Sequence, residues 1–183
     1  MANDSFSEKI VCFGDSITEG YMVAETEAYP SVLSRLLGIT CVNLGVSGET
    51  TFDALRRLNH LDVHLRSAKS VPVLVEFGIN DFFMAIPARE CEANLKNILD
   101  NMGSKGHRPV LFGFCMDYPG VSHWTRLYGH LAKVCNVPLY PNIFKGLSKK
   151  EGDFLSDGLH PSASGYAKMA SSICEFLLAK KLL

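Results

Sequence analysis

The chain has 183 residues, of which 47% are hydrophobic and 20% are charged, and its formal net charge is −1 at pH 7. These values are typical of one soluble globular domain, which we expect to span residues 1–183. They exclude a collagen, a coiled coil and a disordered linker, and they provide no basic surface for a nucleic acid.

Short apolar runs alternate with segments of helical spacing along the whole chain. The runs predict five strands, at residues 9–13, 40–44, 71–77, 109–114 and 137–140. Apolar residues at helical spacing predict helices over 29–37, from 52 onward, over 88–102, over 124–134 and over 161–178. We expect Gly38 and Gly103 to end the first and third of these helices.

This alternation predicts an α/β fold in which right-handed crossovers build a parallel sheet between two layers of helices. Such sheets carry their functional sites at the carboxyl ends of the strands. We therefore looked for reactive side chains in the loops that follow the strands.

Ser16 stands where the first strand meets a helix, directly after Gly14-Asp15. A lone serine in such a turn is most often a helix N-cap. Gly14 allows a sharp turn, however, and a helix N-terminus stabilises developing negative charge. With a histidine elsewhere in the chain, Ser16 is a candidate nucleophile.

A second candidate segment is Asp157-Gly158-Leu159-His160-Pro161, which precedes the last helix. Pro161 keeps His160 out of helical conformation, so both side chains of the pair lie in a loop. At this spacing the Asp157 carboxylate can reach Nδ1 of His160 and leave Nε2 facing outward. Taken alone, the pair is more often a turn aspartate beside an ordinary surface histidine.

Gly48 and Asn80 follow the second and third strands and are candidate hydrogen-bond donors. Attack of a serine on an ester forms an oxyanion that needs preorganised hydrogen-bond donors. A glycine lets a backbone N–H approach closely, and an asparagine amide provides another N–H. Each residue alone is equally well explained as a turn former.

Taken together, these segments resemble the ordered blocks of the SGNH/GDSL hydrolase family, nearest the small thioesterase/lysophospholipase and arylesterase-like branch. The matching segments are residues 14–17, Gly48, residues 78–81, Asp157 and His160. Ile17 stands where the first block usually has leucine, and residues 114–124 match no segment expected there.

The resemblance implies a three-layer, flavodoxin-like α/β/α fold with five parallel strands in the order 2-1-3-4-5. It implies Ser16 as the nucleophile, His160 as the base and Asp157 as the group that orients the base. It also implies an oxyanion hole formed by Ser16, Gly48 and Asn80. We expect no metal, no cofactor and a small-molecule ester as the substrate.

Three apolar residues follow Asn80 directly at the strand end: Phe82, Phe83 and Met84. They are either ordinary core residues or the wall of an acyl pocket, and Tyr118 and Trp124 are weaker candidates for the same pocket. The chain has no long apolar segment for a lid, so we expect small to medium acyl groups. The substrate could be an ester, a thioester, a lysophospholipid or an acetylated sugar.

Two other chemistries fit parts of the sequence. His60 and His64 have the spacing of a helical zinc site, but Leu61 replaces the required glutamate and a solvent-facing helix explains them better. The glycine-containing turn at Ser16 could instead hold a phosphate in a non-catalytic module. A phosphate site would have no use for the Asp157–His160 pair, which favours the hydrolase.

The remaining features concern the location of the protein. Residues 1–13 lack the pattern of a secretory signal, and no apolar run is long enough to cross a membrane. The six cysteines are widely spaced without a close pair, so we expect reduced thiols in a cytoplasmic protein.

Overall fold

The computed structural model describes residues 9–65 and 70–183 and contains a single five-stranded parallel sheet in that part of the chain. The strand order is β2-β1-β3-β4-β5. The strands are β1 (Lys9–Gly14), β2 (Thr40–Gly45), β3 (Pro72–Glu76), β4 (Arg108–Phe112) and β5 (Leu139–Tyr140). All four pairings are parallel, so the predicted α/β architecture and strand order are confirmed.

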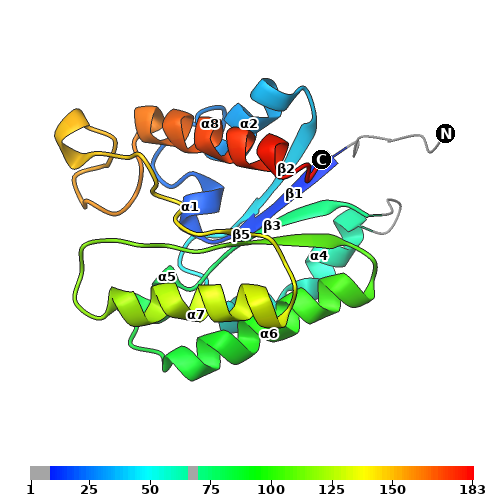
Figure 1. Ribbon diagram of the computed structural model, residues 1–183. Helices are drawn as coiled ribbons and strands as arrows, with labels where there is room; N and C mark the ends of the chain where they lie inside the picture. Colours follow the sequence, from blue (N-terminus) through cyan, green and yellow to red (C-terminus); the bar gives the residue numbers. More distant parts are fainter. Residues whose placement is uncertain (1–8, 66–69) are drawn as a thin grey trace.

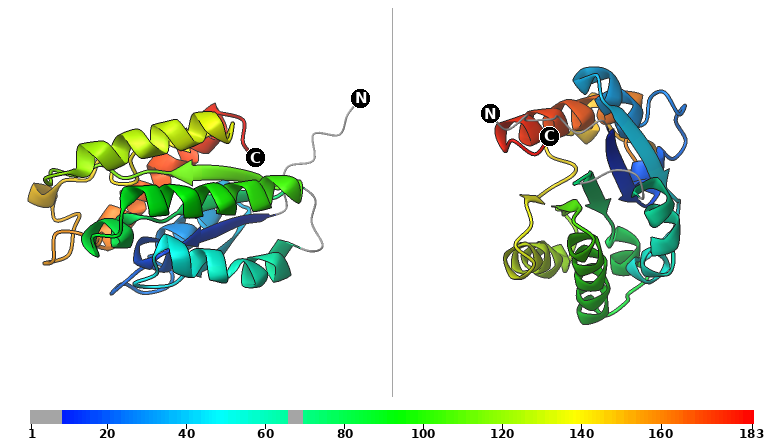
Figure 2. Two further views of the ribbon diagram at one scale, coloured as in Figure 1. Left: turned by 90° about the horizontal axis from the view of Figure 1, so that it is seen from below. Right: turned by 90° about the vertical axis from the view of Figure 1, so that its right-hand side faces the viewer.

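Helices cover both faces of the sheet (Figures 1 and 2). One face carries α1 (Ser16–Glu19), α2 (Tyr29–Leu37) and α8 (Ala163–Ala179). The other carries α3 (Thr51–Arg56), α4 (Leu58–Leu65), α5 (Ile79–Phe83), α6 (Ala88–Ser104) and α7 (Val121–Val134). A short 3₁₀ helix spans Lys149–Glu151.

The burial of the central strands explains why their sequences are continuous apolar runs. Every residue of β3 is buried, and in β1 only Lys9 is not. Such strands contact helices on both faces and read as continuous apolar runs rather than alternating ones. The outer strand β2 is only half-buried over most of its length.

Two helix boundaries differ from the prediction. The helix that opens near Phe52 is two helices, because α3 ends at Arg56 with Arg57 as its C-cap, and α4 begins at Leu58. The helix predicted to end at Gly103 continues to Ser104, and Lys105 is its C-cap. Gly38 has a φ of 67° and caps α2 as predicted.

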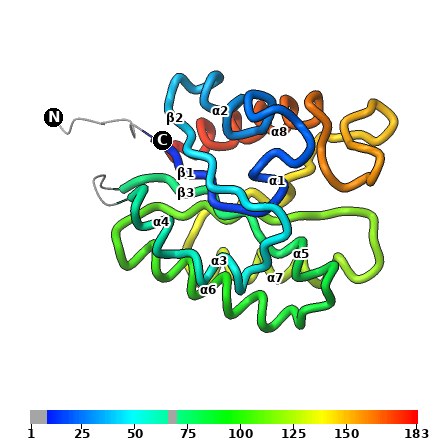
Figure 3. Tube along the Cα trace, turned by 180° about the vertical axis from the view of Figure 1, so that it is seen from behind, coloured from blue at the N-terminus to red at the C-terminus, as the bar shows by residue number. Residues whose placement is uncertain are grey.

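The carboxyl ends of the strands meet at one edge of the sheet. Seen from behind, α1, α5 and the loop before α8 (orange) lie together at this end, and the C-terminus lies at the other (Figure 3). We call this end the carboxyl edge and the opposite end the amino edge. The predicted site segments all lie at the carboxyl edge.

Two further features concern the thiols and the membrane. All six cysteines are free, and Cys12 and Cys91 are buried whereas Cys115 is exposed. Within residues 9–65 and 70–183, no helix combines the length and apolar character that crossing a membrane requires.

Candidate active site

The turn between β1 and α1 holds Ser16, which is 6% exposed. Asp15 is the N-cap of α1, and its Oδ1 accepts a hydrogen bond from the Ile17 N–H at 3.0 Å. The N-cap reading of Ser16 is therefore wrong, because Asp15 fills that role and Ser16 is the first residue of the helix. Since α1 has only four residues, nearby N–H groups rather than a long helix dipole are available to a negative charge.

Gly14 is needed in this turn for a steric reason. A Cβ at this position would lie 2.0 Å from Oγ1 of Thr18 and 2.8 Å from the carbonyl oxygen of Glu76. Both distances are far below a van der Waals contact. The absence of a side chain, rather than a left-handed turn, lets α1 pack against the end of β1.

The loop before α8 brings His160 onto Ser16 across 144 residues of sequence. Ser16 Oγ and His160 Nε2 are 2.9 Å apart, and His160 Nδ1 is 2.7 Å from Asp157 Oδ2. Asp157 Oδ1 also accepts the N–H groups of Leu159 at 2.9 Å and of His160 at 3.0 Å. The three side chains thus form a continuous hydrogen-bonded chain.

The charge of Asp157 follows from these contacts. Burial opposes ionisation, but the hydrogen bonds from Leu159 and His160 outweigh it and hold the pKa of the carboxyl group below its usual range. An ionised Asp157 accepts the Nδ1–H of His160, which leaves Nε2 as an acceptor for the Ser16 hydroxyl.

The geometry of the Asp157–His160 loop is fixed by its backbone. Gly158 has a φ of 69°, the Leu155 N–H donates to the His160 carbonyl at 2.8 Å, and Phe154 and Pro161 form an isolated bridge. These contacts close the loop on itself. The imidazole is therefore held by the fold before any substrate binds.

Tyr21 lies over the imidazole and was not identified from the sequence. Its ring centroid is 4.5 Å from that of His160 with the planes tilted by 40°, and the residue is 41% exposed. No sequence pattern marks Tyr21, because it lies in an irregular loop far from His160 along the chain.

Gly48 and Asn80 lie in the neighbouring loops. Gly48 has a φ of 80°, a conformation that favours glycine, and no heavy atom lies within 4 Å of the position of a Cβ. Asn80 is in α5 rather than in a loop. Its Nδ2 donates to the Glu49 carbonyl at 2.8 Å and to Asp15 Oδ2 at 3.2 Å.

Arg57 holds the loop that contains Gly48. Its guanidinium donates to Glu49 Oε2, to the Leu44 carbonyl at 3.0 Å and to the Gly14 carbonyl at 3.3 Å. One side chain thus joins the ends of β1 and β2 to the loop between β2 and α3. The charge of Arg57 is largely compensated by Glu49.

Asp81 fixes α5 against α3. It accepts hydrogen bonds from the Thr51 N–H at 2.9 Å and from the Thr51 hydroxyl at 2.5 Å. Asp15 and Asp81 therefore hold the segments that flank the site. Glu76, at the end of β3, is a further buried acid that the sequence analysis did not single out.

The three residues after Asn80 differ in their surroundings. Phe82 is half-buried and makes edge-to-face contacts with Phe114, Tyr118 and Trp124. Phe83 is 45% exposed and contacts Phe82 and Tyr118, whereas Met84 is 59% exposed. Phe82 is thus part of a packed aromatic cluster, and Phe83 and Met84 lie at its surface.

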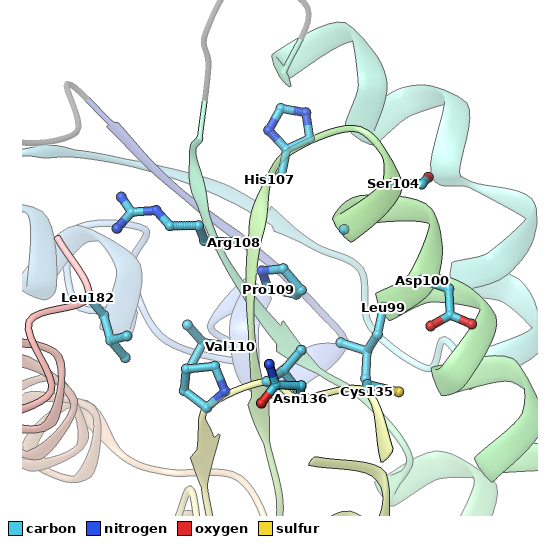
Figure 4. Close-up of a pocket in the computed structure, with 13 residues that line it drawn as sticks. Leu99, Asp100, Ser104, His107, Arg108, Pro109, Val110, Cys135, Asn136 and Leu182 are labelled. Carbon is cyan, nitrogen blue, oxygen red and sulfur yellow. The ribbon is translucent and has the colours of Figure 1, made fainter. Parts of the chain in front are cut away.

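A separate cavity of about 470 Å³ lies at the amino edge of the sheet (Figure 4). Its lining includes Leu99, Asp100, His107, Val110 and Val137 and none of the predicted site residues. Across the described part of the chain, His60 and His64 do not belong to any cluster of three or more metal-binding side chains.

A model of the GDSL-like lipase/acylhydrolase family matches residues 12–168. The chain belongs to this family. The match covers most of the domain and includes all the residues predicted to form the site. It favours the hydrolase over a phosphate-binding module.

Related proteins agree with this assignment. The chain is 27% identical over 182 residues to the arylesterase of Vibrio mimicus, covering 94% of this chain and 89% of that protein. It is 27% identical over 162 residues to the thioesterase 1/protease 1/lysophospholipase L1 of Escherichia coli strain K12, covering 85% and 76%.

Solved structures share the fold. The structure of TesA matches with a TM-score of 0.86 at 23% identity, covering 96% of this chain and 99% of that one. AlinE4, an SGNH-hydrolase family esterase, matches with a TM-score of 0.71 at 28% identity, covering 97% and 98%. The chain is therefore a carboxylic ester hydrolase of the SGNH/GDSL type.

Proposed function

We propose that the protein cleaves carboxylic esters of small to medium acyl chains through a covalent acyl-enzyme on Ser16. The observation that carries the proposal is the hydrogen-bonded chain from Ser16 Oγ to His160 Nε2, 2.9 Å, and from His160 Nδ1 to Asp157, 2.7 Å. Nucleophile, base and orienting group are in contact without substrate.

In the first half of the reaction, Ser16 Oγ attacks the carbonyl carbon and its proton passes to His160 Nε2. The ionised Asp157 stabilises the imidazolium that forms. When the tetrahedral intermediate collapses, the bond to the leaving oxygen breaks and His160 delivers its proton to that oxygen. An alcohol leaves, and the acyl group remains on Ser16.

In the second half, a water molecule attacks the acyl carbon while His160 accepts one of its protons. The ester bond to Ser16 then breaks, and the proton returns from His160 to Ser16 Oγ. The products are a carboxylic acid and the free enzyme. The same imidazole serves both halves because it is held by Asp157 throughout.

The oxyanion of each intermediate would be bound by the backbone N–H groups of Ser16 and Gly48 and by the amide of Asn80. Both hydrogens of Asn80 Nδ2 have protein acceptors in the free enzyme. We expect the Asn80 N–H that donates to the Glu49 carbonyl to donate to the oxyanion instead, while the hydrogen bond from Asn80 to Asp15 stays. Such exchange costs little, because one acceptor replaces another.

The acyl chain would lie against Phe83 and Met84, with Phe82 beneath them. Each buried methylene gains up to about 0.8 kcal/mol, and this gain stops where the apolar surface ends. The names of the relatives refer to an arylesterase and to a thioesterase, protease and lysophospholipase. Neither name refers to a triglyceride lipase.

The proposal is tested by measuring kcat/KM for p-nitrophenyl esters from acetate to palmitate with the wild-type protein and Ser16→Ala. We expect a maximum at or below medium chain length, and loss of turnover in the variant with an unchanged circular dichroism spectrum. A rate that rises steadily through palmitate would contradict the substrate class. Normal turnover by Ser16→Ala would contradict the mechanism.

A further inference from the structure

Glu19, the last residue of α1, holds the loop that contains Gly48. Its side-chain oxygen Oε2 accepts two hydrogen bonds from Ser47, one from the N–H at 2.7 Å and one from the hydroxyl group. Because α1 begins with Ser16, this contact joins the helix of the proposed nucleophile to the loop between β2 and α3.

The backbone of Glu19 is packed against the strand that leads into this loop. The Glu19 carbonyl oxygen accepts a hydrogen bond from Asn43 Nδ2 at 3.1 Å, and Asn43 Oδ1 accepts the N–H of Gly45 at 2.9 Å. A Cβ at Gly45 would lie 2.0 Å from the nitrogen of Glu19. The end of α1 is therefore anchored to the end of β2, and the side chain of Glu19 spans the remaining distance to Ser47.

The loop itself is a tight turn with Gly48 at its third position. The Glu49 N–H donates to the carbonyl of Val46 at 3.4 Å, and Gly48 has a φ of 80°, which a type II turn requires at this position. Type I and type II turns differ by a rotation of the peptide unit between the second and third residues. That unit joins Ser47 to Gly48 and carries the Gly48 N–H, so a group that fixes Ser47 also helps to set the direction of this N–H.

Hydrogen bonds occupy the N–H groups on either side of Gly48. The Ser47 N–H is bound by Glu19, and the Glu49 N–H closes the turn. Arg57 holds the far side of the turn by donating to the side chain of Glu49. The Gly48 N–H itself has no acceptor among the described residues. A donor without an acceptor, held between two anchored residues, is preorganised for a negative charge.

We propose that Glu19 is a positioning residue for the oxyanion hole: its Oε2 atom fixes Ser47 and thereby directs the Gly48 N–H toward the oxyanion. This inference rests on the proposed function, in which the N–H groups of Ser16 and Gly48 bind the oxyanion. Glu19 is joined to Ser16 through α1 and to Gly48 through Ser47, so it holds the two donors in a fixed relation. Its effect should fall on kcat, because the oxyanion develops in the transition state.

The first test compares two substitutions of Glu19 with p-nitrophenyl butyrate as the substrate. Both hydrogen bonds from Ser47 reach one oxygen, so the amide oxygen of Glu19→Gln can accept them, and we expect kcat within about 2-fold of wild type. Glu19→Ala has no acceptor. We expect its kcat to fall about 10-fold, less than the 10²–10³-fold typical of deleting an oxyanion donor, with KM within about 2-fold. Wild-type kcat in Glu19→Ala, or an equal loss in both variants, would overturn the proposal.

Glu27→Ala is the matched control. Glu27 lies in the loop between α1 and α2, is exposed like Glu19, and accepts a hydrogen bond from the Ala24 N–H at 3.0 Å. The substitution thus removes the same kind of contact from a neighbouring loop. We expect kcat to stay unchanged. A 10-fold loss in this control would show that any loosened loop at this edge slows the enzyme, and would overturn the specific role of Glu19.

The second test observes the Gly48 N–H directly and does not depend on activity. Backbone ¹⁵N relaxation is measured by NMR on the wild type, Glu19→Gln and Glu19→Ala. We expect the Gly48 N–H to be as rigid as those of Ser47 and Glu49 in the first two proteins. In Glu19→Ala we expect a lower order parameter or exchange broadening at Gly48. Unchanged relaxation of Gly48 in Glu19→Ala would overturn the proposal.

The failures are distinguishable. If Ser16→Ala keeps full activity, the proposed function is wrong whatever the NMR relaxation shows. If Ser16→Ala is inactive but Glu19→Ala keeps the wild-type kcat, the esterase mechanism stands and the role of Glu19 is wrong.

Discussion

The two edges of the sheet differ in how their polar groups are bound. At the carboxyl edge, Asp15, Asp81 and Asp157 each accept two or more hydrogen bonds and orient neighbouring loops. The amino edge has a cavity of about 470 Å³, yet Nδ1 of His107 beside it is buried without a partner among the described residues. Preorganised polar contacts, rather than hollow volume, mark the reactive edge.

The largest effect expected at the carboxyl edge comes from the base. His160→Ala should lower kcat/KM by about 10⁴-fold, because neither proton transfer has another carrier. Adding Ser16→Ala should cost little more, since the two groups act as one unit. The measurement is a double-mutant cycle on p-nitrophenyl butyrate, and losses that multiply would show that the residues act separately.

The orienting group should matter less than the base. Asp157→Asn keeps the shape of the loop but cannot accept the Nδ1–H of His160 as a carboxylate does. We expect a loss of about 10²-fold in kcat with KM nearly unchanged. A steady-state assay checks this, and wild-type kcat would mean that the backbone alone orients the imidazole.

One substitution made at both edges compares them directly. Gly48 and Gly103 both have open space where a Cβ would lie, but only Gly48 has a positive φ, 80°. Gly48→Ala should cost about 1 kcal/mol of unfolding free energy and roughly 10-fold in kcat. Gly103→Ala, within α6, should raise the unfolding free energy by about 0.5–1 kcal/mol and leave kcat unchanged.

Urea unfolding and esterase assays on these two variants give both quantities. Equal losses of activity in the two variants would remove the distinction between the edges.

The acyl preference should respond to Phe83. Phe83→Ala removes apolar surface beside α5, and we expect the preferred acyl chain to change by one or two methylenes, each worth about 4-fold in kcat/KM. Phe52→Ala is the matched control, a phenylalanine in α3 that is 55% exposed, against 45% for Phe83. The assay is the same ester series, and identical profiles in both variants would exclude Phe83 from the acyl site.

The smallest effect concerns stability against pH. The pKa of Glu76 is about 7 in the folded protein against an ordinary value of 4.5, so the folded state binds more protons in that window. Its contribution to stability is complete below pH 4.5 and is lost as pH rises through about 7. Glu76→Gln should make the unfolding free energy flatter between these values. If the unfolding free energy of Glu76→Gln changes with pH as steeply as that of the wild type, Glu76 does not cause this pH dependence.

The fold was predictable because its strands are buried on both faces. The runs around β1 and β3 are almost purely apolar, and a helix that lies between them in the chain ends at Gly38. The break at Arg57 was not predictable, since it depends on contacts of that side chain with Gly14 and Leu44.

The candidate site was predictable only in part. Ser16, Asp157 and His160 lie in segments with recognisable residue order, and the fold brings them into contact. Tyr21 reaches His160 from an irregular loop, a contact that no local pattern encodes. Glu76 did leave a signal: it is a lone acid in an otherwise apolar strand. A phenylalanine is compatible with both core and surface positions. The exposure of Phe83 could therefore not be predicted from the sequence and is known from the structure.

The most direct test of the account is to label the nucleophile. The protein is incubated with diethyl p-nitrophenyl phosphate, and the modified peptide is identified by mass spectrometry. The account predicts one diethylphosphoryl group per chain, on Ser16, with loss of esterase activity in step with labelling and almost no labelling of His160→Ala. Inactivation with the label on any other residue, or full activity with Ser16 labelled, would contradict it.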